Sequence, residues 1–168
     1  PPAPRSMRIG VVCDTHNHLA NVQRIVALFN AARVERVIHT GDVTQPKTIA
    51  AFAGLQAPLH GVYGNNDEPE RPALEQAIAT HGFEFHDPPW QIEWAGRSIL
   101  VVHDPETFAG ADGECDLALH GHTHRLRIER RPGNRLLFNP GECAGHLPGL
   151  NAVGVVDLRS SDVTLLRF

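Results

Sequence analysis

The sequence predicts an α/β fold, a four-layer α/β/β/α sandwich in which two mixed β-sheets lie face to face between outer layers of helices. Two observations support this prediction. In the first half of the chain, short apolar runs alternate with segments of helical periodicity, which indicates strand–turn–helix units and a parallel sheet. In the second half, short strands follow one another with only turn signals between them, which indicates largely antiparallel pairing.

Three apolar runs of strand type are expected in the first half, at residues 8–13, 36–40 and 59–63. Each run is followed by a segment that we expect to be helical, at residues 19–32, 46–53 and 72–81. In the first of these segments Val22, Ile25 and Phe29 fall at helical spacing, so they form one apolar stripe. Pro46 lies in the first turn of the second segment and Gly82 follows the third, which suits a helix start and a helix end.

Eight further strands are expected after Gly82, at residues 83–85, 90–94, 98–103, 116–120, 126–131, 135–139, 152–157 and 163–167. Residues 1–6 are expected to be a disordered tail or a remnant of the expression vector. The remaining residues, 7–168, are expected to form one domain, since the hydrophobic fraction of 42% suits a single sizeable core.

The composition excludes several classes of function. A formal net charge of −4 provides no long-range attraction for DNA or RNA, so nucleic acid is expected only as a substrate held locally. The longest apolar runs, such as residues 98–102, are too short to span a bilayer. Cys13, Cys115 and Cys143 form an odd number without paired spacing, which indicates a reducing compartment. We therefore expect a cytoplasmic protein.

Five polar clusters each follow a predicted strand. They are Asp14-x-His16, Gly41-Asp42, Gly64-Asn65, His103 and Gly121-His122-x-His124. Ligand crevices in open α/β sheets lie outside the carboxyl ends of the strands, so clusters in these positions can meet. Each cluster is a weak signal alone, because a Gly-Asp pair is a common turn. Together, so many nitrogen and oxygen ligands would be costly to bury without a cation, and we predict a metal site.

The segment from Leu119 to His124 has the clearest ligand spacing. If it is extended, His122 and His124 share a face and both reach a point beyond the strand, while Thr123 turns away. Gly121 is expected to supply backbone angles that a residue with a Cβ would resist. The alternative is a polar loop with two solvated histidines, and the presence of the four other clusters favours metal ligands.

The ordered set of clusters resembles the motif of the calcineurin-like metallophosphoesterase superfamily. In size the chain is similar to the small bacterial and archaeal phosphodiesterase branch of that superfamily. The resemblance covers residues 8 to about 125, and Asn139-Pro140-Gly141 resembles a later turn of the family. It implies a dinuclear metal-dependent phosphoesterase that hydrolyses a phosphate ester by in-line attack of a metal-bridging hydroxide.

The resemblance also implies the ligands. One ion would be held by Asp14, His16, Asp42 and His124. A second ion would be held by Asp42, Asn65, His103 and His122. Asp42 would therefore bridge the two ions, and we take Asp42, Asn65 and His103 as the catalytic residues. Carboxylate, amide and imidazole ligands without thiolate suit divalent Mn²⁺, Fe, Co, Ni or Zn²⁺, and we favour Mn²⁺.

The sequence departs from the family pattern at two positions. Asn66 stands where many phosphatases of the superfamily have a histidine that assists the leaving group, and an asparagine cannot supply a proton at neutral pH. That role is then empty, or it is filled by His18, His146 or solvent. The second departure is Asp104, directly after His103, where glycine is common. Its carboxylate either orients an imidazole or lies in solvent.

The missing proton donor favours a phosphodiesterase over a monoesterase, because a diester with a good leaving group tolerates the absence better. The expected substrate is a small phosphate ester, contacted by Asn17, His18 and Asn66. A phosphomonoesterase for a small metabolite and a non-catalytic protein-binding scaffold of the same fold are the alternatives. Self-association is left open, and no membrane contact is expected. His39, inside a predicted strand, is expected to serve packing alone.

Overall fold

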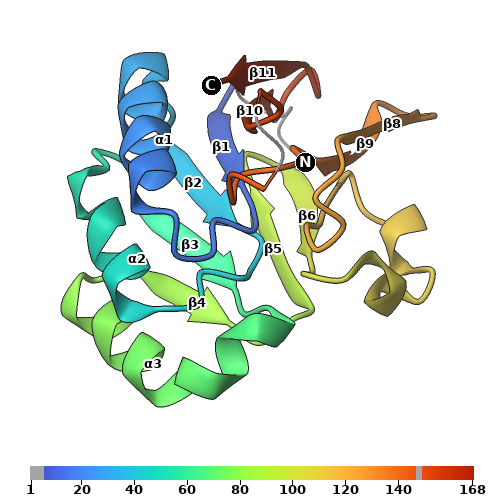
Figure 1. The fold of residues 1–168 in the computed structure, drawn as a ribbon. Coiled ribbons are helices and arrows are strands. Elements are labelled where there is room, and N and C mark those ends of the chain that lie inside the picture. The colour runs from blue at the N-terminus through green and yellow to red at the C-terminus, as the bar shows by residue number, and fades with distance from the viewer. Residues whose placement is uncertain (1–5, 147–148) are drawn as a thin grey trace.

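The computed structural model describes residues 6–146 and 149–168, whose strands form two sheets packed face to face (Figure 1). In the described residues the first sheet has the strand order β11-β10-β1-β2-β3-β4 and the second has the order β5-β6-β7-β9-β8. The strands of the first sheet are β1 (Arg8–Val12), β2 (Arg36–His39), β3 (Leu59–Val62), β4 (Glu84–His86), β10 (Ala152–Asp157) and β11 (Val163–Arg167). Those of the second are β5 (Trp90–Trp94), β6 (Arg97–Val101), β7 (Leu117–Leu119), β8 (Arg127–Arg131) and β9 (Arg135–Asn139).

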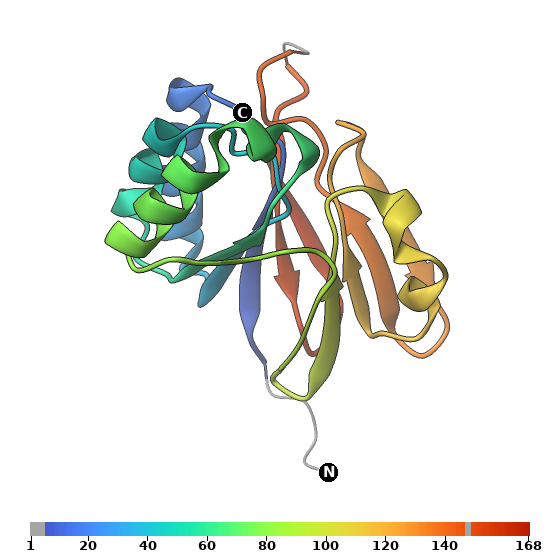
Figure 2. The ribbon, with the colours of Figure 1, turned by 90° about the horizontal axis from the view of Figure 1, so that it is seen from below.

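Helices cover the outer face of the first sheet (Figure 2). They are α1 (Leu19–Ala32), α2 (Pro46–Ala51) and α3 (Arg71–Thr80). The strands β1 to β4 run parallel, because each helix returns the chain to the same end of the sheet. The predicted stripe of α1 is confirmed, since Val22, Ile25 and Phe29 are buried in one cluster with Val12 and Val37 of the sheet.

The second predicted helix is shorter than expected. α2 ends at Ala51, and a 3₁₀ helix (Phe52–Gly54) completes the segment. A 3₁₀ helix that the periodicity did not predict, Asn65–Glu70, precedes α3. It begins directly after Gly64, so a tight helical turn carries one of the predicted ligand clusters.

The second sheet is mixed, and its topology differs from the prediction in part. The pairs β5–β6 and β8–β9 are antiparallel as expected, but β6–β7 and β7–β9 are parallel. The prediction of largely antiparallel pairing is therefore wrong for the centre of this sheet. Parallel neighbours need a crossover, and the chain between β6 and β7 supplies one through the 3₁₀ helices Pro105–Phe108 and Ala111–Gly113. Phe108 shares an apolar cluster with Leu100 and Leu137, so these short helices form the outer layer here.

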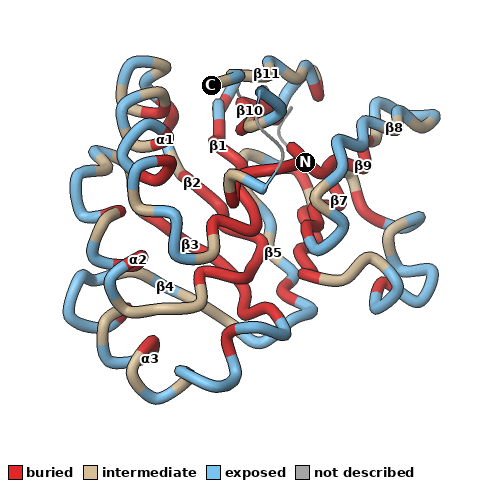
Figure 3. Tube along the Cα trace, in the orientation of Figure 1, coloured by how far each residue is buried: buried red, intermediate tan, exposed pale blue. Residues whose placement is uncertain are grey.

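The main core lies between the two sheets. Val11, Ile38 and Val62 from the first sheet share one buried cluster with Ile99 and Phe138 from the second. Figure 3 shows the trace of β1, β2 and β3 buried along most of its length. Burial of a side chain of this size stabilises the fold by about 1.5–3 kcal/mol, so the sandwich is a rigid support for the loops at its rim.

The predicted tail lies mostly outside the described residues, which begin at Ser6. The Ser6 hydroxyl donates a hydrogen bond to the Asp157 carboxylate over 3.3 Å. Among the helices of the described residues, none combines the length and the apolar character that a membrane crossing requires.

Candidate metal centre

The loops after β1, β2, β3, β6 and β7 meet at one rim of the sandwich, and these loops carry all the predicted ligands. Backbone hydrogen bonds join them. The amide of Asp14 donates to Gly41 O over 3.0 Å, and the amide of Gly121 donates to His103 O over 3.0 Å. The Nδ1 atom of His103 lies 3.0 Å from Thr40 O, which links the loops of the two sheets.

Asp14, His16 and His124 form one group of donors, with ligand atoms all within 4.8 Å of one another. Asp14 Oδ1 lies 3.6 Å from His124 Nε2. Asp14 Oδ1 and His16 Nε2 are buried and lack a hydrogen-bond partner among the described residues. A buried polar atom without a partner costs about 1–3 kcal/mol, so these two lone pairs fit a bound cation.

Asp14, Asp42 and His103 form a second group within the same limit of 4.8 Å. Asp42 Oδ2 lies 3.3 Å from His103 Nε2 and 3.7 Å from His16 Nε2, so one carboxylate reaches both groups. Burial raises the pKa of Asp42, but hydrogen bonds from His103 and Asn66 outweigh it and lower that pKa to about 2. Asp42 is therefore a carboxylate at neutral pH. Burial dominates at Asp14 and raises its pKa.

Left-handed backbone conformations cluster at this rim. Positive φ angles occur at Asp14 (49°), His16 (45°), Asp42 (65°), His122 (72°) and His124 (55°). Each such conformation of a residue other than glycine costs on the order of 1–3 kcal/mol and persists only where the surroundings hold it. Five of the seven predicted ligands therefore share a strained geometry that is typical of functional sites.

This finding corrects the interpretation of the Gly-His-x-His segment. β7 ends at Leu119, so the segment is not extended. Left-handed turns at His122 and His124, rather than the alternation of a strand, direct the two rings. Gly121 is needed for space instead of for unusual angles. A Cβ there would lie 2.6 Å from Asp14 Oδ2 and 2.8 Å from Thr40 Oγ1.

In two histidine rings of the centre, the Nδ1 atom points away from the other donors and has a hydrogen-bond partner. His103 Nδ1 faces Thr40 O, and His124 Nδ1 lies 3.1 Å from Oε1 of the buried Glu142. The Nε2 atoms of both rings face the carboxylates of the centre. An imidazole that donates its Nδ1 proton can offer an ion the lone pair of Nε2 when Nε2 carries no proton. Sequence reasoning missed Glu142, although it follows the Asn-Pro-Gly turn directly.

His122 is held less firmly. Its Nδ1 atom lies 3.2 Å from His103 Nε2, while its Nε2 atom is 4.0 Å from Asp104 Oδ2. The side chain of Asp104 is 37% exposed, and its other oxygen accepts a hydrogen bond from the amide of Glu106. Of the two readings left open for Asp104, the structure thus shows a partly solvated carboxylate at the edge of contact with an imidazole.

Asn65 and Asn66 occupy different positions. Asn65 is exposed and lines a cavity of about 310 Å³ together with His103 and His122. Asn66 contacts Asp42 instead, through Nδ2 to Oδ2 over 2.8 Å and through its amide to Oδ1 over 3.0 Å. The structure therefore brings Asn65 to the rim, whereas Asn66 supports the predicted bridging carboxylate.

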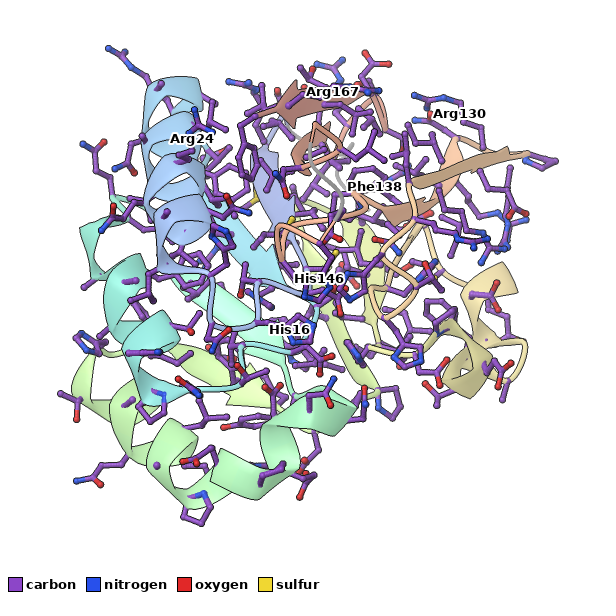
Figure 4. All side chains as sticks on the ribbon, in the orientation of Figure 1. His16, Arg24, Arg130, Phe138, His146 and Arg167 are labelled. Carbon is purple, nitrogen blue, oxygen red and sulfur yellow. The ribbon has the colours of Figure 1, made fainter. Side chains whose placement is uncertain are left out.

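The other two predicted substrate contacts lie on the loop after β1. His18 is the N-cap of α1, where its Nδ1 atom accepts a hydrogen bond from the amide of Asn21 over 3.1 Å. Asn17 is exposed on the turn between β1 and α1. His146 is closer to the centre. Its ring lies 5.7 Å from that of His16 and 5.5 Å from that of His124 (Figure 4).

Asp67, which the sequence analysis did not single out, joins two ligand loops. Its buried carboxylate accepts hydrogen bonds from the amides of Asp42 (3.0 Å), Gly64 (2.7 Å) and Thr44 (2.7 Å). A Cβ on Gly64 would overlap Asp42 Oδ1, so the two loops are also in direct contact. The only local signal for Asp67 was its position three residues after Gly64.

His39 has a role beyond packing, which corrects the expectation from the sequence. Its Nδ1 atom accepts a hydrogen bond from the amide of Gly41 over 3.0 Å, and its Nε2 atom lies 2.9 Å from Thr15 Oγ1. Burial lowers the pKa of His39 to about 3, so the ring is neutral and can make both contacts. It ties the loop after β1 to the loop after β2.

Oxygen and nitrogen donors that converge at the rim of such a sandwich are typical of a metal-dependent hydrolase. The chain belongs to the calcineurin-like phosphoesterase superfamily, whose domain model matches residues 7–161. This match confirms the resemblance seen in the sequence and identifies the chain as a phosphoric ester hydrolase of that superfamily.

Individual relatives agree with the family. The chain is 33% identical over 161 residues to the phosphodiesterase MJ0936 of Methanocaldococcus jannaschii, which covers 93% of this chain and 96% of that protein. It is 30% identical over 156 residues to a protein of Methanothermobacter thermautotrophicus named as a probable metallophosphoesterase, which covers 91% of this chain and 86% of that protein.

Solved structures show the same fold. A structure described as a novel archaeal phosphodiesterase superposes with a TM-score of 0.87 at 30% identity and covers 96% of this chain and 100% of its own. Vps29 of Entamoeba histolytica superposes with a TM-score of 0.64 at 21% identity and covers 96% and 98%. At an identity of 21%, the match to Vps29 is evidence for the fold alone.

Proposed function

We propose that this chain is a dinuclear metal-dependent phosphodiesterase that acts on small phosphate esters, with residues 7–168 as its single domain. The observation that carries the proposal is the pair of buried donors without partners, Asp14 Oδ1 and His16 Nε2, beside the low-pKa carboxylate of Asp42. The names of the archaeal relatives support the diester as the substrate class.

The donors suit two ions that share Asp42. The first ion would be held by Asp14, His16, Asp42 and His124, and the second by Asp42, Asn65, His103 and His122. When bound, the two ions would supply positive charge and an activated water for in-line displacement at phosphorus. We favour Mn²⁺, because the donors are oxygen and imidazole nitrogen without thiolate.

The residues of the chain prepare this centre before substrate arrives. Thr40 O and Glu142 hold the Nδ1 atoms of His103 and His124, so the Nε2 atoms of both rings are directed towards the carboxylates of the centre. Asp14 and Asp42 are the two buried carboxylates of the donor set, and they offset only part of the charge of two divalent ions. The centre therefore keeps positive charge for an anionic ester.

Asn66 gives the centre its preference for a diester in this proposal. Its side chain is engaged with Asp42, and an amide cannot protonate a leaving group. The departing oxygen must then carry its own negative charge, so hydrolysis should depend steeply on the pKa of the leaving group. Aryl diesters meet this requirement better than alkyl esters.

We place the enzyme in the cytoplasm. All three cysteines, Cys13, Cys115 and Cys143, are free and buried, which supports a reducing compartment.

The test is an assay of the Mn²⁺-loaded protein with bis(4-nitrophenyl) phosphate and with 4-nitrophenyl phosphate at neutral pH. The proposal expects faster hydrolysis of the diester. Faster hydrolysis of the monoester would identify a phosphomonoesterase. If the loaded protein hydrolyses neither ester, the chain has kept the fold as a scaffold and the proposal is wrong.

A further inference from the structure

A groove of about 390 Å³ lies between residues 124–126 and 140–142, which flank the pair β8–β9, and the strands β10 and β11. Its apolar wall is formed by Leu126, Pro140, Leu150, Ala152 and Leu165. Leu126 and Leu150 are 46% and 55% exposed, although large apolar side chains of the described residues are mostly buried. A concave surface of this size and apolar character is typical of a site for a small molecule.

The groove also carries positive charge. Arg125 and Arg167 line it, and neither guanidinium has a hydrogen-bond or ion-pair partner among the described residues. Figure 4 shows Arg167 at the edge of the molecule, on β11. A guanidinium presents several donors to a carboxylate or phosphate, so an apolar ligand with a negative charge fits this groove better than a neutral one.

The groove is continuous with the candidate metal centre. His124 directs Nε2 towards Asp14 over 3.6 Å, and the same residue lines the groove together with Glu142. A molecule in the groove therefore touches a residue that we expect to hold an ion. This continuity favours part of the substrate, rather than an unrelated ligand, as the occupant.

We propose that this groove binds the ester substituent of the substrate that is not displaced, and that this substituent is an apolar ring with a negative charge of its own. The inference rests on the proposed function and names the substrate class for the same centre. The Leu126 and Leu150 side chains contact the ring, and Arg125 and Arg167 face its charge.

The test measures binding, so it does not depend on turnover. Calorimetry with the Mn²⁺-loaded protein compares three phosphonate methyl esters, methyl methylphosphonate, methyl 4-carbamoylphenylphosphonate and methyl 4-carboxyphenylphosphonate, in which the ring is joined to phosphorus by carbon and cannot be displaced. The aryl ring should tighten binding about 10-fold over the methyl group, because the apolar wall covers it. The carboxylate should add about 2- to 5-fold over its neutral carbamoyl counterpart, as expected for a partly exposed ion pair.

Two variants and their controls locate the effect. Leu150→Ser should remove most of the preference for the ring, and Arg167→Gln should remove the preference for the carboxylate. Ile128→Ser and Arg159→Gln are the matched controls, because both residues are exposed and neither lines the groove. Both controls should keep the wild-type preferences.

The proposal is overturned if the three esters bind equally well, or if the two groove variants keep the wild-type preferences. It is also overturned if Leu150→Ser changes only the sedimentation of the protein from dimer to monomer, since the groove would then be an interface between copies. Hydrolysis of bis(4-nitrophenyl) phosphate is scored separately. Protein that shows the binding preferences without hydrolysis would refute the proposed function and leave the groove assignment standing.

Discussion

The two halves of the candidate metal centre differ in how firmly their donors are held. The half assigned to the first ion combines the buried Asp14 with His124, whose ring is 22% exposed and hydrogen-bonded to the buried Glu142. The half assigned to the second ion ends in His122, which is 41% exposed, and in the exposed Asn65. Only Asp42 and His103 of that second half are buried.

The difference has a thermodynamic consequence. Donors that packing and hydrogen bonds already hold in place lose little conformational freedom when a ligand binds. Exposed side chains such as Asn65 and His122 must be ordered when the ion arrives, which costs about 0.5–1.5 kcal/mol for each side chain. We therefore expect the first ion to bind more tightly than the second, and four predictions can break or sharpen this comparison.

The largest effect is expected at the shared carboxylate. Asp42→Asn removes charge from both halves, so kcat/KM for a diester should fall on the order of 10³-fold or more. Asn65→Ala removes one neutral donor from the exposed half and should cost much less. The measurement is steady-state hydrolysis of bis(4-nitrophenyl) phosphate at saturating Mn²⁺. Equal residual activities in the two variants would contradict the assigned bridge.

The next prediction compares the two carboxylates that lie beside histidine donors, Glu142 beside His124 and Asp104 beside His122. Glu142→Gln should weaken binding of the first ion about 10- to 100-fold, because the orienting partner of His124 loses its charge. Asp104→Asn is the matched control on the exposed half, where the distance to His122 is 4.0 Å, and it should change affinity little. Calorimetric titration with Mn²⁺ decides between them. A larger loss in the control than in Glu142→Gln would reverse the comparison.

Asp67 should affect stability as well as the centre. Asp67→Asn replaces an acceptor of three backbone amides by a group that can accept only at its one oxygen. A lost buried acceptor costs about 1–3 kcal/mol, so the free energy of unfolding of the metal-free protein should fall by that amount in urea titrations. A change within the error of the titration would show that the two loops do not depend on this carboxylate.

The smallest effect is expected at His18. Because His18 caps α1, His18→Ala should cost about 0.5–2 kcal/mol of unfolding free energy. The dependence of hydrolysis on leaving-group pKa should not change, since the ring that caps the helix is not the proton donor. A series of aryl diesters tests this. A steeper dependence in the variant would identify His18 as the proton donor for the leaving group.

Some of the residues in these predictions could be identified from the sequence, and others could not. The order of the five clusters was sufficient to predict that the side chains of five residues lie close together, because parallel strands bring their carboxyl ends to one rim. They are Asp14, His16, Asp42, His103 and His124. The supporting residues were not visible in this way. Glu142 and Asp67 act on residues 18 and 25 positions away, and no local spacing encodes such contacts.

In the fold, too, local features could be predicted from the sequence, whereas features set by distant contacts could not. Local periodicity was sufficient for α1 and for strands such as β5 and β9, whose bounds agree with the prediction. It could not give the parallel pairing of β7 with β6 and β9, because that pairing is set by a crossover made of 3₁₀ helices with little sequence signature. The left-handed conformations of His122 and His124 also depend on the surrounding loops, so the extended reading failed there.

The most direct test is a calorimetric titration of the metal-free protein with Mn²⁺, combined with elemental analysis of the loaded protein. We predict two ions per chain that bind in two resolved steps, and Glu142→Gln should weaken the tighter step and leave the other nearly unchanged. A stoichiometry that stays at zero would contradict the metal centre itself. Two ions of equal affinity, with Glu142→Gln weakening both alike, would contradict the difference between the two halves.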